Sequence, residues 1–167
     1  MSPRDFIFDE RGSAATEFAL ILPLLILLLF TGSEAGHFVW TQHKLTEGVR
    51  NGVRYASRLP IDKLCNGSTV VLADPERAAI IQITRTGRVA PTAASATVPG
   101  WTAANVSVDV SCGAFVQTGI YSDLGARGPI VTVRANNVPY PSLFKSLGRI
   151  PGTIRLNARA STAGIGI

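Results

Sequence analysis

The acidic residue Glu17 has the position that most suggests a chemical role. It stands at the start of an apolar run, Phe18 to Ser33, in which no residue is charged. A carboxylate at the edge of a membrane is costly unless it is paired, so such acids usually have a defined partner. The alternative is that Glu17 lies among lipid headgroups near a helix start, where the helix dipole stabilises an acid that has no partner.

The other titratable residues do not form a catalytic or metal-binding set. His37 and His43 are the only histidines, and no cysteine or acid stands at metal-ligand spacing to them. We therefore expect no enzyme, no metal and no cofactor. Both histidines flank Trp40, and amphipathic rings of this kind are typical of a membrane boundary.

Two cysteines, Cys65 and Cys112, follow the apolar run. An even number of cysteines in an oxidising compartment favours pairing. A periplasmic location therefore predicts a disulfide between them. The alternative is two buried free thiols.

The apolar run is long enough to cross a membrane. It continues past the single acid Glu34 to Trp40, which gives about 20 mostly apolar residues. A secretory signal peptide would have a short apolar centre followed by small residues. Here the small residues Gly12 to Ala15 precede the run, so the pattern favours a permanent membrane helix.

The same helix is expected to continue into water. Residues 13–58 contain one proline, Pro23, and a helix over this range would be about 70 Å long, about twice what a membrane needs. Pro23 predicts either a kink or a tolerated defect. Beyond the span an apolar stripe recurs at helical spacing, and the helix should end before Pro60. The stripe consists of Leu45, Val49, Val53 and Ala56.

Three basic residues share the opposite side of this amphipathic segment. Arg50, Arg54 and Arg58 recur at four-residue spacing. They would contact lipid headgroups or an acidic partner, or form a plain solvated face.

The remainder of the chain predicts a small α+β body. Asp74 followed by Pro75 is typical of a helix start, with Asp74 as the N-cap. Alternating apolar residues predict three strands, over 105–112, 130–135 and 153–160. The fold class is α+β: a long N-terminal transmembrane and amphipathic helix packed on a small antiparallel sheet of about three strands.

The formal net charge of +5 does not indicate nucleic-acid binding. The basic residues are spread from Arg4 to Arg159 without a dense block, whereas a nucleic-acid-binding surface clusters them. We expect no nucleic-acid partner. A mildly basic body beside an anionic membrane surface accounts for the charge.

The residues around Glu17 form a motif with a known counterpart. Gly12 precedes the small residue Ser13, Glu17 follows the glycine by five positions, and Phe18 stands next to the acid. This arrangement resembles the processing site of type IV prepilins, and the Glu-Phe pair resembles the form found in the Tad pilus system. The run from Arg11 to Arg58 is similar to the TadE-like minor pilin and pseudopilin family, including the Leu-Pro inside the span and the pattern VRNGVR after it. The segments VTVRANN, VPYPSLFKSLG and TIRLNARASTAG also resemble that family.

The resemblance implies cleavage after Gly12 by a dedicated prepilin peptidase, which leaves Ser13 as the mature N-terminus. It implies that Glu17 pairs with the Ser13 amine of a neighbouring subunit, and that Glu17 and Pro23 lie where helices pack during assembly. The implied partners are the peptidase, other pilin and pseudopilin subunits, the inner-membrane pilus assembly machinery and membrane lipid.

The resemblance also implies a pilin-like organisation and location. Residues 1–12 would be a cytoplasmic leader, 13–59 the N-terminal helix and 60–167 a periplasmic body. The protein would cross the bacterial inner membrane once, or join the surface pilus.

The charges around the span predict the opposite orientation. Basic residues favour the cytoplasmic side of a membrane. Two of them precede the span and four follow it closely: Arg4, Arg11, Lys44, Arg50, Arg54 and Arg58. We nevertheless expect the N-terminus in the cytoplasm, as the resemblance implies.

The expected function is a minor pilin or pseudopilin that serves assembly or priming of a Tad-type pilus used in surface adherence. The alternative is a permanently anchored periplasmic binding or sensing module in which Gly12 and Glu17 occur by coincidence. That module would not be processed at all.

Overall fold

The computed structural model describes residues 13–89, 95–113, 128–144 and 154–165. The leader, Gly12 and almost all of the segment GAFVQTGIYSDLGARG lie outside these ranges. The chain divides into two units, Met1–His37 and Phe38–Ile167.

The helix α1 runs over Ser13–Ser57 and passes through Pro23 without interruption. Its residues 14–33 are all exposed. The helix ends three residues before Pro60, as the sequence predicted, because the residue before a proline is pushed out of helical geometry.

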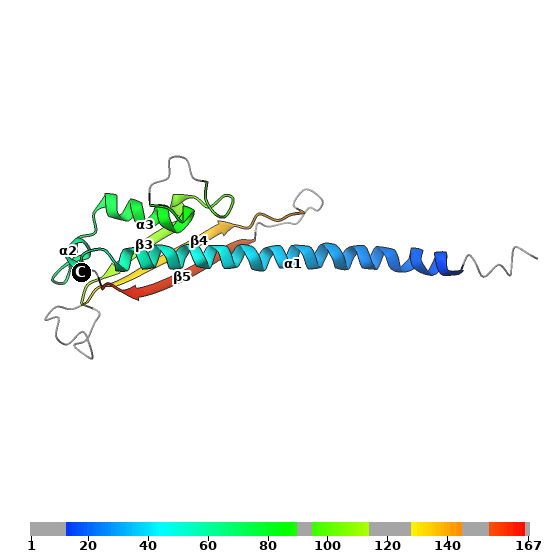
Figure 1. Cartoon of the computed structure of the whole chain (residues 1–167), viewed down its shortest axis with the longest axis horizontal. Helices are drawn as coiled ribbons and strands as arrows, with labels where there is room; N and C mark the ends of the chain where they lie inside the picture. The colour runs from blue at the N-terminus through cyan, green and yellow to red at the C-terminus, as the bar shows by residue number, and fades with distance from the viewer. Residues whose placement is uncertain (1–12, 90–94, 114–127, 145–153, 166–167) are drawn as a thin grey trace, which may run out of the picture. The chain divides into compact units, whose positions relative to one another are not determined.

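The centre of the second unit is an antiparallel sheet in the order β3-β4-β5 (Figure 1). Its strands are β3 (Val106–Ser111), β4 (Ile130–Pro139) and β5 (Arg155–Ala163). Alternation predicted β4 only as far as residue 135, but the strand continues through an irregularity between Ala135 and Val138. Asn137 has a φ of 55° there, a left-handed conformation that asparagine tolerates better than most residues. The predicted α+β fold with a three-stranded antiparallel sheet is confirmed.

The apolar stripe of α1 is buried in the same core as the sheet. Leu45, Val49, Val53 and Ala56 are at most 4% exposed and belong to one cluster with Val131 and the other inward residues of the strands. The amphipathic half of α1 therefore covers one face of the sheet.

The helix α3 spans Asp74–Thr86 and buries Ile80, Ile83 and Thr84. Its N-cap is Ala73, without a side-chain cap, so the prediction that Asp74 would be the N-cap was wrong by one residue. Asp74 lies inside the first turn instead, where the helix dipole still favours an acid.

The loop after α3 contributes to the core, which the sequence did not indicate. Val98 and Trp101 are each 1% exposed, although they stand in a stretch rich in Ala, Thr, Pro and Gly without periodicity. Four short elements were also not predicted: α2 (Ile61–Leu64), the hairpin strands β1 (Cys65–Asn66) and β2 (Thr69–Val70), and the 3-10 helix η2 (Ala103–Asn105).

Candidate functional site

The predicted processing site lies at the start of α1. Gly12 is outside the described residues, and Ser13 is the first residue of the helix. A glycine does not favour helix, so a protease can bind the backbone in an extended form at such a position.

Glu17 is exposed, and its carboxylate makes no hydrogen bond or ion pair with any residue in the described ranges. The helix begins at Ser13 and has no acid in its first turn. Because stabilisation by the helix dipole falls off within the first turn, it acts only weakly on Glu17. The described residues therefore supply no ion-pair partner for this carboxylate.

The surface around Glu17 is strongly apolar. Phe18 is 59% exposed and Leu20 is 81% exposed. Among the described residues α1 is the one helix long and apolar enough to cross a membrane, with a mean hydropathy of 2.2 over its best window. This surface needs a cover of lipid or of other apolar helices.

Two residues of the apolar run, Pro23 and Thr31, affect the hydrogen bonds of the helix differently. Pro23 carries no backbone N–H, so one helical hydrogen bond is missing at this point. Thr31, in contrast, donates its hydroxyl to the carbonyl oxygen of Leu27 at 2.8 Å, which satisfies this side chain within the helix itself. The helix continues past both residues.

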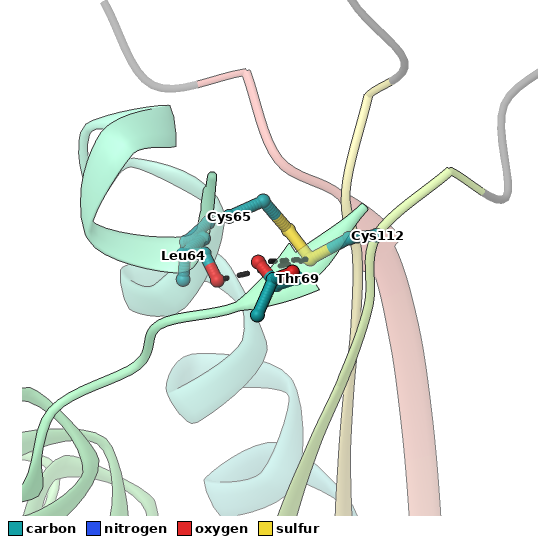
Figure 2. Close-up of a disulfide and its surroundings, with 4 residues drawn as sticks. All are labelled: Leu64, Cys65, Thr69 and Cys112. Carbon is teal, nitrogen blue, oxygen red and sulfur yellow. Dashed lines mark hydrogen bonds between the residues drawn. A yellow bond between two sulfur atoms is a disulfide. The ribbon is translucent and has the colours of Figure 1, made fainter. Parts of the chain in front are cut away.

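Cys65 and Cys112 form the predicted disulfide (Figure 2). The bridge joins β1 to the residue after β3, with the Cα atoms 5.8 Å apart across 47 positions of sequence. The carbonyl oxygens of Leu64 and Thr69 lie 3.8 and 3.5 Å from Cys112 Sγ. A disulfide sulfur has no proton, so these are packing contacts that surround the bridge.

Two glycines of α1 allow α3 and the following loop to approach closely. A Cβ atom placed on Gly48 would lie 2.8 Å from Cη2 of Trp101, and one placed on Gly52 would overlap Oγ1 of Thr84. Spacing of four residues puts both glycines on one side of the helix. We call Gly48 and Gly52 the glycine seam. Sequence reasoning noted the small-and-arginine pattern here but missed its role, because the contacting residues lie 32 or more positions away.

Three arginines in the last turns of α1 and just after it face solvent. Arg50, Arg54 and Arg58 are exposed, and their guanidinium groups have no hydrogen-bond or ion-pair partner in the described part of the chain. The structure thus places all three where water, a lipid headgroup or an acidic partner can reach them.

The described residues contain no group of three or more histidines, cysteines or acids close enough to hold a metal ion. His43 is exposed on α1.

The family model described as TadE-like protein matches residues 12–54. The match begins at Gly12, includes Ser13, Glu17 and Phe18, and ends after the glycine seam, so it covers about a quarter of the chain. It confirms the predicted resemblance for this segment. No curated protein and no solved structure matches the chain. Over residues 12–54 the chain is therefore similar to TadE-like proteins, and among the described residues α1 is the helix that could anchor it in a membrane.

Proposed function

Because residues 12–54 match the TadE-like family, we propose that this protein is a minor pilin or pseudopilin that serves assembly or priming of a Tad-type pilus. A prepilin peptidase cleaves it after Gly12. The observation that carries the proposal is the match itself, which starts at Gly12 and extends through the apolar run of α1 to residue 54.

Cleavage would change what the helix can join. It removes a leader with five charged residues: Arg4, Asp5, Asp9, Glu10 and Arg11. A charged leader opposes lateral packing of apolar helices, because its charges would have to be desolvated or kept at the membrane face. The mature protein would begin at Ser13, with an exposed apolar surface free to pack against other pilin subunits.

The new N-terminus would supply the partner that Glu17 lacks. Cleavage creates an amine at Ser13, and an amine and a carboxylate in an apolar environment attract each other strongly. Pairing of Glu17 with the Ser13 amine of a neighbouring subunit would satisfy both charges. This interaction would favour insertion of each subunit in one register.

The proposed topology places the leader in the cytoplasm and the body in the periplasm. The disulfide supports it, since disulfides persist in oxidising compartments and are rare in the cytosol. Peptidase, assembly machinery and lipid would meet the helix, and other pilins and pseudopilins would meet both helix and body.

The experiment is intact-mass and N-terminal peptide mass spectrometry of the protein from its own membranes, with and without the prepilin peptidase. A chain that begins at Ser13 only when the peptidase is present supports the proposal. The variant Gly12→Leu should remain uncleaved. Gly32→Leu, the same change within the apolar helix, should still be cleaved.

Retention of Met1 or Ser2 in both strains would contradict processing. The permanently anchored binding or sensing module would then be the better account. Cleavage at another bond, unaffected by Gly12→Leu, would show that the motif has been assigned to the wrong residues.

A further inference from the structure

The face of the sheet that points away from α1 carries an unusual pair of like charges. Arg134 on β4 and Arg159 on β5 stand directly opposite each other in the strand register. Like charges in directly opposed positions destabilise a sheet. The strands could carry neutral residues here at no cost to the core, because the inward positions are Val133, Ala135 and Ala160.

Neutralisation of this pair within the chain is weak. Among the described residues Arg134 pairs with Asp109, whose Oδ2 lies 3.9 Å from Nη1 of Arg134, and the side chains of Asp109 and Arg134 are 59% and 42% exposed. Exposed ion pairs of this kind contribute little. Nε of Arg134 is moreover buried and has no hydrogen-bond partner among the described residues.

Two asparagines complete the surroundings of the arginines. Arg134, Asn136, Asn157, Ala158 and Arg159 line one shallow hollow on this face. The side chain of Asn157 is fixed by the backbone irregularity at Asn137, because Asn157 Oδ1 accepts a hydrogen bond from the Asn137 N–H at 2.9 Å. We call Arg134, Asn136, Asn157 and Arg159 the arginine patch.

The composition of the arginine patch favours a carboxylate ligand on a protein. Guanidinium groups bind carboxylates through two parallel hydrogen bonds, and asparagine amides bind peptide backbone equally well as donor and acceptor. A membrane-binding surface would add apolar or aromatic side chains that enter the lipid. The neighbouring positions on this face instead carry polar residues: Ser107, Asp109, Thr132 and Ser161.

We propose that the arginine patch is a docking site for an acidic segment of a partner protein, held by paired guanidinium–carboxylate hydrogen bonds from Arg134 and Arg159. The carboxylate relieves the repulsion between the two arginines and accepts hydrogen bonds from the exposed nitrogens of their guanidinium groups. The site is separate from the processing motif and does not depend on cleavage after Gly12.

The test is fluorescence anisotropy of a labelled oligoglutamate peptide with the full chain in neutral detergent. Oligoglutamine serves as the uncharged probe. Arg134→Gln and Arg159→Gln should each weaken oligoglutamate binding about tenfold, which corresponds to about 1.4 kcal/mol. The matched controls Arg50→Gln and Arg54→Gln remove the same charge from the exposed side of α1 and should change the affinity less than about twofold.

Arg134→Lys separates hydrogen-bond geometry from charge. Lysine keeps the charge but cannot form two parallel hydrogen bonds to a carboxylate. The affinity of this variant for oligoglutamate should therefore lie between the affinities of the wild type and Arg134→Gln. If Arg134→Gln lowers the melting temperature, Arg159→Gln and Arg134→Lys decide the question.

Three results would overturn the proposal. Equal losses from the Arg50 and Arg134 variants would mean unspecific attraction to a basic protein. Binding of oligoglutamine as tight as that of oligoglutamate would exclude a carboxylate site. Tighter binding of phosphatidylglycerol vesicles or inorganic phosphate, with the same dependence on Arg134 and Arg159, would identify a phosphate site instead.

Discussion

At the scale of single residues, the glycine seam shows why this helix cannot use better helix formers everywhere. Alanine in a helix interior is more favourable than glycine by about 1 kcal/mol. At Gly52 that gain is opposed by the hydroxyl of Thr84, which occupies the space of the missing Cβ atom. Thr84 is itself fixed, because Oγ1 donates to the carbonyl oxygen of Ile80 at 2.7 Å and the residue is completely buried.

We predict that Gly52→Ala lowers the stability of the folded body. Overpacking costs about 1 to 3 kcal/mol, which exceeds or matches the gain in helix propensity. Thermal unfolding of the full chain in detergent, followed by circular dichroism, measures the change. Gly36→Ala is the matched control, because a Cβ atom there meets nothing within 4 Å, and it should not lower the melting temperature.

A second substitution identifies the clash. The double variant Gly52→Ala with Thr84→Ala removes the opposing hydroxyl and should be more stable than the two single changes predict by addition. If the stability changes of the two single variants simply add in the double variant, the methyl group added by Gly52→Ala does not clash with Thr84. The loss of stability in Gly52→Ala would then have another cause.

Glu17 makes a different kind of prediction, since its carboxylate contributes no contact within the described residues. Glu17→Gln should leave the folded body unchanged but reduce filament assembly, because the amide cannot pair with an amine as an ion. Counting pili by electron microscopy measures assembly, and mass spectrometry checks that cleavage after Gly12 continues. The control is Glu47→Gln, which changes an exposed acid of α1 whose ion pair, among the described residues, is with Lys44 at 3.4 Å. A normal number of pili in the Glu17→Gln strain would contradict the proposed ion pair between Glu17 and the Ser13 amine.

At the scale of elements, the disulfide holds the least regular part of the body to the sheet. The α2 segment and the β1–β2 hairpin are short, and Cys65 ties them to the end of β3. A backbone hydrogen bond also connects the segment after β5 to the end of α1. Ile165 donates its backbone N–H to the carbonyl oxygen of Ser57 at 2.9 Å, which satisfies one of the unpaired carbonyl groups at the end of α1.

We predict that loss of the bridge destabilises the body substantially. In the chain-entropy model a closed loop of this length contributes about 4 kcal/mol, because the bridge restricts the unfolded chain. Cys65→Ser with Cys112→Ser should therefore lower the melting temperature clearly. A reducing agent should lower the melting temperature of the wild type and leave that of the double variant unchanged. A wild type that is insensitive to reduction would show that the bridge contributes little.

At the scale of the whole molecule, the periodicity of apolar residues predicted the longer helices and strands, because these depend mainly on residues that are close in the sequence. The membrane helix, the stripe from Leu45 to Ala56, α3 and all three strands of the sheet follow from patterns of apolar residues. Trp101 and Val98 were missed because their burial depends on distant elements that converge over an irregular loop. The extension of β4 beyond Ala135 was missed because the bulge at Asn137 breaks the alternation. The exposed site residues Glu17 and Phe18 could be named from motif alone, whereas the pairing of Arg134 with Arg159 required the strand register.

The orientation of the molecule in the membrane brings two physical arguments into conflict. Four basic residues follow the span closely, which favours a cytoplasmic body. The disulfide favours a periplasmic body, because cytosolic thiols are kept reduced. A bridge between two cysteines so far apart in the sequence is a property of the folded body as a whole, and it responds to the compartment directly. We give it more weight than the count of charges.

We therefore predict that Cys65 and Cys112 are oxidised in living cells. Cells lysed in acid and treated with a maleimide–polyethylene glycol reagent should show no mass shift of the protein unless it is first reduced. In a strain without its periplasmic thiol oxidase, part of the protein should react without reduction, since the bridge would then form slowly. Complete reaction without reduction in the normal strain would indicate that the body lies in the cytosol. The orientation favoured by the basic residues after the span would then be the correct one.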